Sequence, residues 1–320
     1  MSTESVTRSS LFVAASMLVV AAGVWWIWRA GSDEPPQAVT TSIEVQTAAL
    51  NDPAWRGLSD LVREPTSAKW YAVPERQRSL LQLTQNPLQI AAIVPISGVP
   101  DDLDLESLDF VDPTTLLLGT ESHEPDRASD ALFVLRLTGS AGQEKAKVER
   151  RIDLPYALWQ IKANENHGME GLCVLPGGKT VLVGTELAVP QAGQRLAPLG
   201  RLDLQSGTWR GHWLRLTSAD GKISALACRS AATGTRLWAI ERHYGTSRIL
   251  TVDLPADPTS LESMAILQPT VWLDLAPNLS YLPNWEGLVP LSDNNVVLLS
   301  DNASGDVVRG PSYWLALTRK

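Results

Sequence analysis

The sequence lacks the signatures of several large protein classes. It has no excess of basic residues, because 27 Lys and Arg stand against 35 Asp and Glu in 320 residues and give a formal net charge of -8. A nucleic-acid-binding body needs a basic surface for phosphates, so no nucleic-acid partner is expected. Glycine and proline do not cluster, and hydrophobic residues make up 44% of the chain. This composition excludes collagen, a coiled coil and extensive disorder, and it predicts a buried core.

Catalytic and cofactor motifs with fixed spacing are also absent. The chain contains no G-x-S-x-G elbow, Walker loop, H-E-x-x-H or C-x-x-C motif. A serine-triad esterase is therefore disfavoured, and no organic cofactor is expected. Long amphipathic patterns of helical period are missing as well, which disfavours an α/β fold.

One long apolar run stands near the N-terminus. Leu11 to Trp28 carries no charge, and as a helix its 18 residues would span about 27 Å, close to the hydrocarbon thickness of a bilayer. We expect a short tail over residues 1–10, a membrane anchor over 11–28, a linker over 29–41 and a folded body over 42–320. The body would then lie outside the cytoplasm, on the periplasmic side of the inner membrane if the source is bacterial. The alternative is a signal peptide cleaved near Val20 to Ala22, followed by secretion.

The body contains an internal repeat, which is typical of propellers and solenoids. Each copy opens with a short strand that contains a leucine, and these leucines are separated by 50, 64, 54 and 62 residues: Leu58, Leu108, Leu172, Leu226 and Leu288. A second, more hydrophobic strand follows each opening and ends in an acid: Glu75, Glu121, Glu186, Glu241 and Asp301. We therefore predict an all-β propeller of five blades. Six blades are the alternative if a long interval conceals a degenerate copy.

The last copy is too short to complete its blade. Only 32 residues follow Leu288, enough for the second strand and one more around Tyr313 to Leu317. Ser42 to Gln46 lies upstream of the first repeat and has the pattern of a strand. We expect this segment to pair with the last blade and so close the ring without an exposed edge.

The repeated acids predict a cation site. Counting outward from the turns places three opening acids opposite three closing acids: Glu106 with Glu121, Glu170 with Glu186 and Glu286 with Asp301. Like charges in facing positions destabilise a sheet unless a cation, a shared proton or a basic neighbour compensates. Calcium is the simplest resident, because it takes six to eight oxygen ligands. Asp102, Asp104 and Glu106 stand at every second position and could add ligands from one face of a strand. The alternative is that these acids only cap strands or pair with Arg76 and Arg242.

Histidines follow the same positions. His123 and His243 follow closing acids by two residues, and His167 precedes Glu170 by three. A histidine titrates near neutral pH and can act as a general acid or base, and His167 is our first choice for that role. Arg242, next to Glu241, is predicted to bind the charge of an anionic small-molecule substrate. His167, Arg242 and Glu241 are therefore the catalytic candidates.

The two cysteines lie in the first strands of neighbouring repeats. Cys173 and Cys228 differ by one in their distance from the aligned leucines, which places them on opposite strand faces. Two buried thiols are predicted for this reason. A disulfide is the alternative if the body lies outside the cytoplasm.

Three ordered segments carry a resemblance to a known family. Asn166 to Leu172 running to Glu186, Ile223 to Leu226 with Ile240 to Arg242, and Asn284 to Leu288 with Leu299 to Asn302 resemble the phytase-like propeller family, also called "esterase-like activity of phytase". The likeness covers roughly Trp55 to Leu317. It implies an extracytoplasmic propeller, often membrane-anchored, with phosphoester or ester hydrolase activity.

Parts of the sequence depart from the phytase-like family and from the true β-propeller phytases. Arg56 and Ser224 stand where other copies carry an opening acid, which weakens a fully acidic ring. Asn51 to Trp55 is similar to a fragment of the aspartate-rich signature of true β-propeller phytases, but the first acid and the rest of that signature are absent. The sequence leaves two functional readings: a metal-assisted hydrolase, or a scaffold that binds a cell-envelope partner around a structural cation.

Overall fold

The computed structural model describes residues 35–52, 54–140, 142–164, 167–191, 193–232, 234–243, 245–304, 307–308 and 310–320. The expected membrane anchor over residues 11–28 lies outside these ranges. Within them, no helix combines the length and the apolar character needed to cross a bilayer.

The described chain is almost entirely β-structure. Short 3₁₀ turns occur at η1 (Tyr156–Trp159) and η2 (Pro258–Ser260). The first two antiparallel groups are β2 (Leu58–Arg63), β3 (Trp70–Pro74), β4 (Ser79–Gln85) and β5 (Leu88–Ser97), then β6 (Leu103–Asp112), β7 (Thr115–Ser122), β8 (Ser129–Thr138) and β9 (Lys145–Pro155). A short parallel contact between β5 and β9 joins these two groups at the rim.

The following sheets repeat the same order of antiparallel neighbours. One contains β10 (Met169–Val174), β11 (Thr180–Thr185), β13 (Gln194–Asp203) and β14 (Trp209–Arg215), with β12 (Val189–Gln191) on β13 and β18 (Ile266–Leu267) on β14. The next contains β15 (Lys222–Ala231), β16 (Gly234–His243), β17 (Thr246–Leu254) and β19 (Thr270–Asp274). A small hairpin joins β22 (Ala303–Ser304) to β23 (Val307–Val308).

The remaining sheet joins the two ends of the described chain. It runs β20 (Asn284–Pro290), β21 (Asn295–Asp301), β24 (Ser312–Arg319) and β1 (Ile43–Leu50). Strand β1 pairs antiparallel with β24 from Ile43 opposite Arg319 to Leu50 opposite Ser312. The upstream strand therefore hydrogen-bonds to the last strand of the chain, where it covers what would otherwise be an exposed sheet edge.

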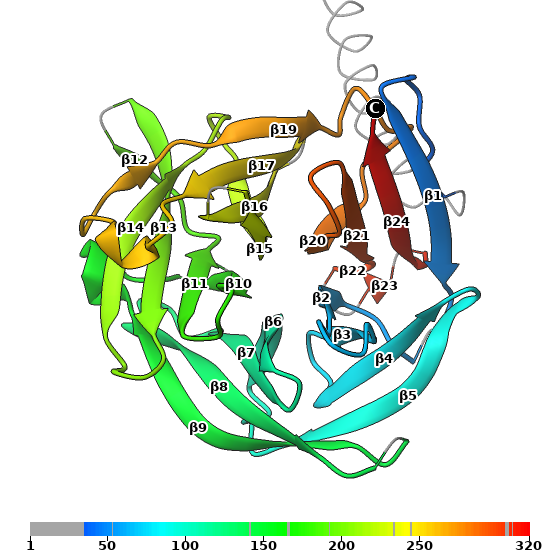
Figure 1. Cartoon of the computed structure of the whole chain (residues 1–320), viewed down its shortest axis with the longest axis horizontal. Coiled ribbons are helices and arrows are strands. Elements are labelled where there is room, and N and C mark those ends of the chain that lie inside the picture. Colours follow the sequence, from blue (N-terminus) through cyan, green and yellow to red (C-terminus); the bar gives the residue numbers. More distant parts are fainter. Residues whose placement is uncertain are drawn as a thin grey trace, which may run out of the picture.

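The sheets radiate around a common centre (Figure 1). Strands β2, β6, β10, β15 and β20 surround that centre, and β5, β9, β19 and β1 lie at the outside. Buried apolar side chains fill the space between neighbouring sheets, as in the cluster that contains Val73, Leu80, Leu105, Leu116 and Phe133. A ring of antiparallel sheets that pack face to face is a β-propeller, and the all-β prediction is confirmed.

Each innermost hairpin contains a β-bulge at the same repeat position. The first strand of each hairpin has one extra residue, at which its pairing with the second strand shifts by one. A buried leucine follows two residues later. The bulge residues are Ser59, Glu106, Glu170, Ser224 and Glu286. The leucines that follow them are Leu61, Leu108, Leu172, Leu226 and Leu288.

These bulges correct two details of the sequence analysis. The aligned leucine of the first repeat is Leu61 and not Leu58. The extra residue also displaces the expected carboxylate pairs, since Glu121 faces Asp104 and Asp301 faces Asn284. Counting outward from a turn assumes an unbroken ladder, and a bulge breaks it.

The cysteines are joined, contrary to the prediction of two thiols. Cys173 on β10 and Cys228 on β15 form a disulfide, with their Cα atoms 5.4 Å apart. Both lie in the apolar layer between these neighbouring sheets. In a ring of sheets, one face of each sheet packs against the opposite face of the next, so residues on opposite faces are the ones that meet.

We predict that reducing this bond destabilises the fold. The bond closes a loop of 55 residues, and the chain-entropy relation gives about 4 kcal/mol for a loop of that size. The double variant Cys173→Ala/Cys228→Ala should lower the midpoint of urea unfolding to the same extent as dithiothreitol does for the native chain. Dithiothreitol added to the double variant is the control and should have no effect. Equal stability of the native chain with and without reductant would contradict the prediction.

Candidate functional site

The candidate site lies where the innermost strands begin. In each innermost hairpin, the residue two positions before the bulge lies opposite a residue at the end of the second strand. These five pairs meet around one end of the central channel. The pairs are Gly57 with Glu75, Asp104 with Glu121, Gly168 with Glu186, Lys222 with Arg242, and Asn284 with Asp301. We call these ten residues, together with Glu106, Glu170 and Glu286 at the bulges, the mouth.

In the sheet formed by β15, β16, β17 and β19, Arg242 and not Glu241 lies at the mouth. Arg242 faces Lys222, whereas Glu241 faces Ile223 one residue earlier, and successive side chains of a strand point to opposite faces. The fully buried Glu241 carboxylate instead accepts hydrogen bonds from the amides of Thr217 (3.0 Å) and Ser218 (2.9 Å) and from the Ser218 hydroxyl (2.7 Å). These contacts hold the loop in place, and the catalytic role of Glu241 stays a prediction.

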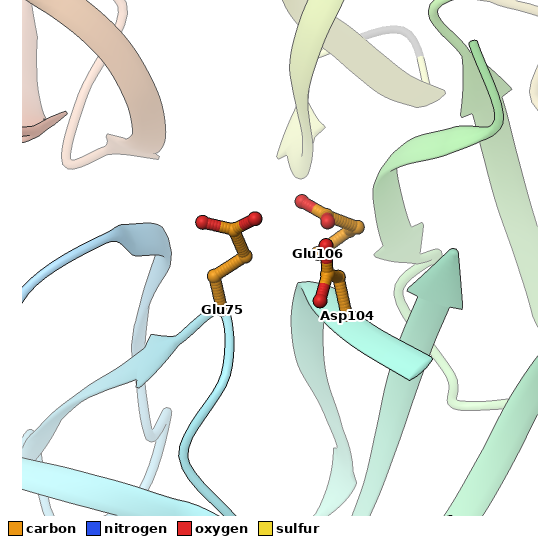
Figure 2. Close-up of side chains that lie close together, drawn as sticks. All are labelled: Glu75, Asp104 and Glu106. Carbon is orange, nitrogen blue, oxygen red and sulfur yellow. The ribbon is translucent and has the colours of Figure 1, made fainter. Parts of the chain in front are cut away.

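Three carboxylates approach one another closely on one side of the mouth. One ligand oxygen each from Glu75, Asp104 and Glu106 lie within 4.8 Å of one another. Figure 2 shows Glu75 reaching from the end of β3 toward Asp104 and Glu106 on β6. Glu106 and Asp104 were predicted from the sequence as cation ligands, whereas Glu75 was not. We call Glu75, Asp104 and Glu106 the acid triad.

Burial affects the protonation of two triad members, Glu75 and Glu106. It raises the pKa of Glu75 to about 7, and the hydrogen bond and charge of Asp104 act in the same direction. The pKa of Glu106 is also raised well above its usual range, first by burial and then by the charge of Glu170. Two members of the triad have basic partners: Arg76 Nε lies 3.6 Å from Glu75 Oε1 and 3.8 Å from Asp104 Oδ1, and His123 Nε2 lies 2.9 Å from Asp104 Oδ2. The charge of Arg76 opposes the rise in the pKa of Glu75 only in part.

The opposite side of the mouth contains cations of the protein itself. Arg242 Nη2 lies 2.6 Å from Glu286 Oε1, and Lys222 Nζ lies 3.1 Å from Glu186 Oε2. Burial raises the pKa of Glu286 to about 8, although the Arg242 charge opposes this shift. Burial also raises the pKa of Glu170, and the charge of Glu186 adds to it. The mouth thus has an acidic side at the triad and a mixed side at Arg242 and Lys222.

Asn284 links two acids of the last sheet on the mixed side. Its Nδ2 donates to Glu286 Oε1 at 2.8 Å and to Asp301 Oδ2 at 3.1 Å. The backbone amide of Ala303 donates to the other Asp301 oxygen at 2.7 Å. These bonds fix the orientation of both carboxylates.

A network of buried side chains around Arg127 supports the mouth next to Gly168. Arg127 Nε lies 2.6 Å from Asp130 Oδ1, and its Nη2 lies 2.9 Å from Glu121 Oε1. Glu121 accepts the amide of Gly168, and Asp130 accepts the amide of Met169 at 3.1 Å. A Cβ on Gly168 would lie 2.1 to 2.6 Å from atoms of Arg127, Asp130 and Glu121, so only glycine fits. Arg127 and Asp130 were not predicted from the sequence: Arg127 lies in the loop before β8, and Asp130 lies near the start of β8.

The histidines occupy different settings. His167 is half-buried and directly precedes Gly168, beside the Arg127 network. His243 Nδ1 lies 3.2 Å from Asp220 Oδ2. His212 is fully buried within β14, where burial lowers its pKa to about 4. The catalytic role of His167 stays a prediction.

The raised carboxyl pKa values predict a pH dependence of stability. The folded protein keeps protons on Glu286 up to about pH 8 and on Glu75 up to about pH 7, whereas the unfolded chain releases them near 4.5. The folded state therefore binds more protons, and in EDTA its free energy of unfolding should fall as the pH rises from about 5 to about 8. Thermal melts across this range measure the fall.

Glu286→Gln removes one of the titrating groups and should make that fall shallower. Glu149→Gln, on the outer strand β9, is the matched control and should leave the slope unchanged. Identical slopes for the native chain and the Glu286 variant would refute the assignment.

The chain is similar to several solved propeller structures at low identity. The glutaminyl cyclase of Myxococcus xanthus matches with a TM-score of 0.45 and 13% identity over 90% of this chain and 100% of that one. A streptogramin B lyase matches at 0.39 and 11%, covering 86% and 98%. These scores carry no argument about activity, and the propeller assignment rests on the strand topology.

The sequence comparison is more specific. A search of curated proteins finds no match. The phytase-like family, described as "Esterase-like activity of phytase", matches residues 53–303. Because this match covers most of the chain, the protein belongs to the phytase-like family.

Proposed function

We propose that this protein is a membrane-anchored, extracytoplasmic propeller of five blades whose mouth binds a divalent cation and hydrolyses a phosphorylated or esterified small molecule. The blade count follows from grouping each innermost strand with the three strands outside it. The observation that carries the functional proposal is the acid triad, whose ligand oxygens lie within 4.8 Å of one another.

The acid triad has the chemistry of a calcium site. Calcium binds carboxylate oxygens at 2.3 to 2.6 Å, so two ligands of one ion lie at most about 5 Å apart. The three side chains meet this limit without rearrangement of the strands. Burial and mutual repulsion raise the pKa of Glu75 and of Glu106, and a cation would relieve that repulsion. Calcium is the first candidate because all the ligands are hard oxygens.

The other mouth residues supply complementary groups. Glu121, Glu170, Glu186, Glu286 and Asp301 surround the acid triad as further acids, but Glu121, Glu186 and Glu286 already have basic partners. A bound cation lowers the pKa of a coordinated water and so supplies a nucleophile at neutral pH. His167 would accept a proton, and Arg242 with Lys222 would bind the anionic group of the substrate. Glu241 has no part in this scheme.

The second candidate is a scaffold propeller that binds a cell-envelope partner around a structural cation. The internal ion pairs favour it, since Arg242 and Lys222 already contact carboxylates and would need to release them to bind a substrate. Fold alone does not separate the two functions.

We predict that calcium stabilises the protein through the acid triad. At 100 times its dissociation constant a ligand adds about 2.7 kcal/mol of stability, which should raise the melting temperature by several degrees relative to EDTA. Glu106→Gln should abolish this shift, and Glu149→Gln should retain it. Because ligand carboxylates must lose their protons, the calcium affinity should rise between about pH 6 and about pH 8. No shift with calcium, or a full shift in the Glu106 variant, would remove the acid triad as a cation site.

We further predict hydrolysis of small phosphoesters or carboxylic esters that depends on His167. His167→Ala should lower kcat by about 100-fold or more, the usual contribution of a general acid or base, while the calcium-induced rise in melting temperature stays unchanged. The measurement is a calcium-dependent turnover screen with p-nitrophenyl phosphate and p-nitrophenyl acetate. Calcium binding without turnover of any substrate would favour the scaffold function. Equal turnover in the native chain and the His167 variant would exclude this residue from the mechanism.

A further inference from the structure

The end of the central channel opposite the mouth contains a separate cavity of about 300 Å³. The five aligned leucines form its floor, and each is at most 4% exposed: Leu61, Leu108, Leu172, Leu226 and Leu288. These leucines come two residues after the bulges, so they separate this cavity from the carboxylates of the mouth. The two ends of the channel therefore offer different chemistry to a ligand.

Most residues that line the cavity have apolar side chains, although polar and apolar atoms contribute similar shares of its surface. Twelve of its fifteen lining residues are hydrocarbon or sulfur side chains, and the other three are Arg63, Asp109 and Arg229. Leu291 at the rim is 40% exposed, although it is a large apolar side chain. A concave apolar surface with few polar groups is typical of a small-molecule site, and a volume of about 300 Å³ lies at the small end of the range for such sites.

Arg63 and Arg229 are the two basic residues that line the cavity. Asp109 is already occupied, because its two oxygens accept the amides of Phe110 and Val174, both at 2.7 Å. Arg229 lies 3.3 Å from one oxygen of Asp293, which also contacts Arg236 at 3.3 Å, and Asp253 pairs with Arg236 at 2.6 Å. The pair between Arg229 and Asp293 is exposed at the carboxylate, and exposed ion pairs contribute little, so an anionic ligand can compete for Arg229.

Arg63 adds a second cation at the end of β2. Its guanidinium carbon lies 5.8 Å from the centre of the Trp70 ring. Such a contact uses the face of the guanidinium and not its N–H donors, which lie in the plane of the group. Arg63 is exposed and Arg229 is half-buried, so an anion can reach both from solvent.

We propose that this cavity binds a small aliphatic monocarboxylate, with its hydrocarbon chain against the leucine floor and its carboxylate at Arg63 and Arg229. Burial of the chain supplies affinity in proportion to the apolar area removed from water. Arginine binds a carboxylate through two parallel N–H donors, so it selects the charged end of the ligand. The site is independent of the cation site, because the leucine floor lies between them.

The test measures hexanoate binding to the full-length chain by calorimetry, with hexanol and hexylammonium as uncharged and cationic analogues. We expect saturable binding of hexanoate and at least tenfold weaker binding of both analogues. The double variant Arg63→Gln/Arg229→Gln should weaken hexanoate binding at least tenfold. Arg151→Gln, an exposed arginine on β9, is the matched control and should bind as the native chain does.

A photoreactive aliphatic diazirine carboxylate locates the site directly. Its label should fall on peptides that contain Arg229 or Leu291, and excess hexanoate should suppress it. Leu291→Trp narrows the rim and should reduce labelling while the melting temperature is retained. Labelling elsewhere, equal affinity for hexanol, or association with anionic vesicles without binding of free hexanoate would each overturn the proposal. Glu106→Gln should leave hexanoate binding unchanged, which keeps failure at this cavity distinct from failure at the mouth.

Discussion

The repeated β-bulge in the innermost hairpins is the constraint on which the site depends. A bulge adds one residue to a strand, bends it and re-aims the side chain at that point. Here it occurs at Glu106, Glu170 and Glu286, and at serines in the other two innermost strands. Because each sheet carries the bulge at the same height, acids from distant parts of the chain meet at one end of the channel. An unbroken ladder would give different facing pairs.

Gathering so many carboxylates in a buried place requires compensation, and the protein provides it with its own cations, within one sheet at Arg127 and between neighbouring sheets at Lys222 and Arg242. Arg127 serves Glu121, Lys222 serves Glu186, and Arg242 serves Glu286. Breaking such a buried pair would leave an uncompensated charge, which destabilises a fold strongly. At the acid triad, Arg76 and His123 pair with Glu75 and Asp104, while burial among other acids raises the pKa of Glu106. The same charges thus hold sheets together on one side and define the candidate site on the other.

The channel is chemically asymmetric along its axis. Asp60 and Asp109 connect successive sheets beneath the mouth, since Asp60 accepts the amide of Leu108 and Asp109 accepts that of Val174. Burial raises the pKa of both acids, yet each satisfies a backbone donor that packing would otherwise leave unpaired. The leucine floor then closes the channel. The channel therefore has acids at one end and a leucine-lined cavity with arginines at its rim at the other. Both arise because a given position of the repeat lies at the same level along the channel axis in every innermost strand.

The sequence alone determined the elements of this protein, and only the tertiary structure decided which residues meet. Strands such as β8 and β17 follow from alternating hydrophobic residues and turn signals, because these are local properties. The closing role of the segment at β1 followed from counting strands. The bulges, the choice of Arg242 over Glu241 and the Cys173–Cys228 bond did not follow. Each depends on how one sheet packs against the next, and a shift of a single residue reverses the face to which a side chain points.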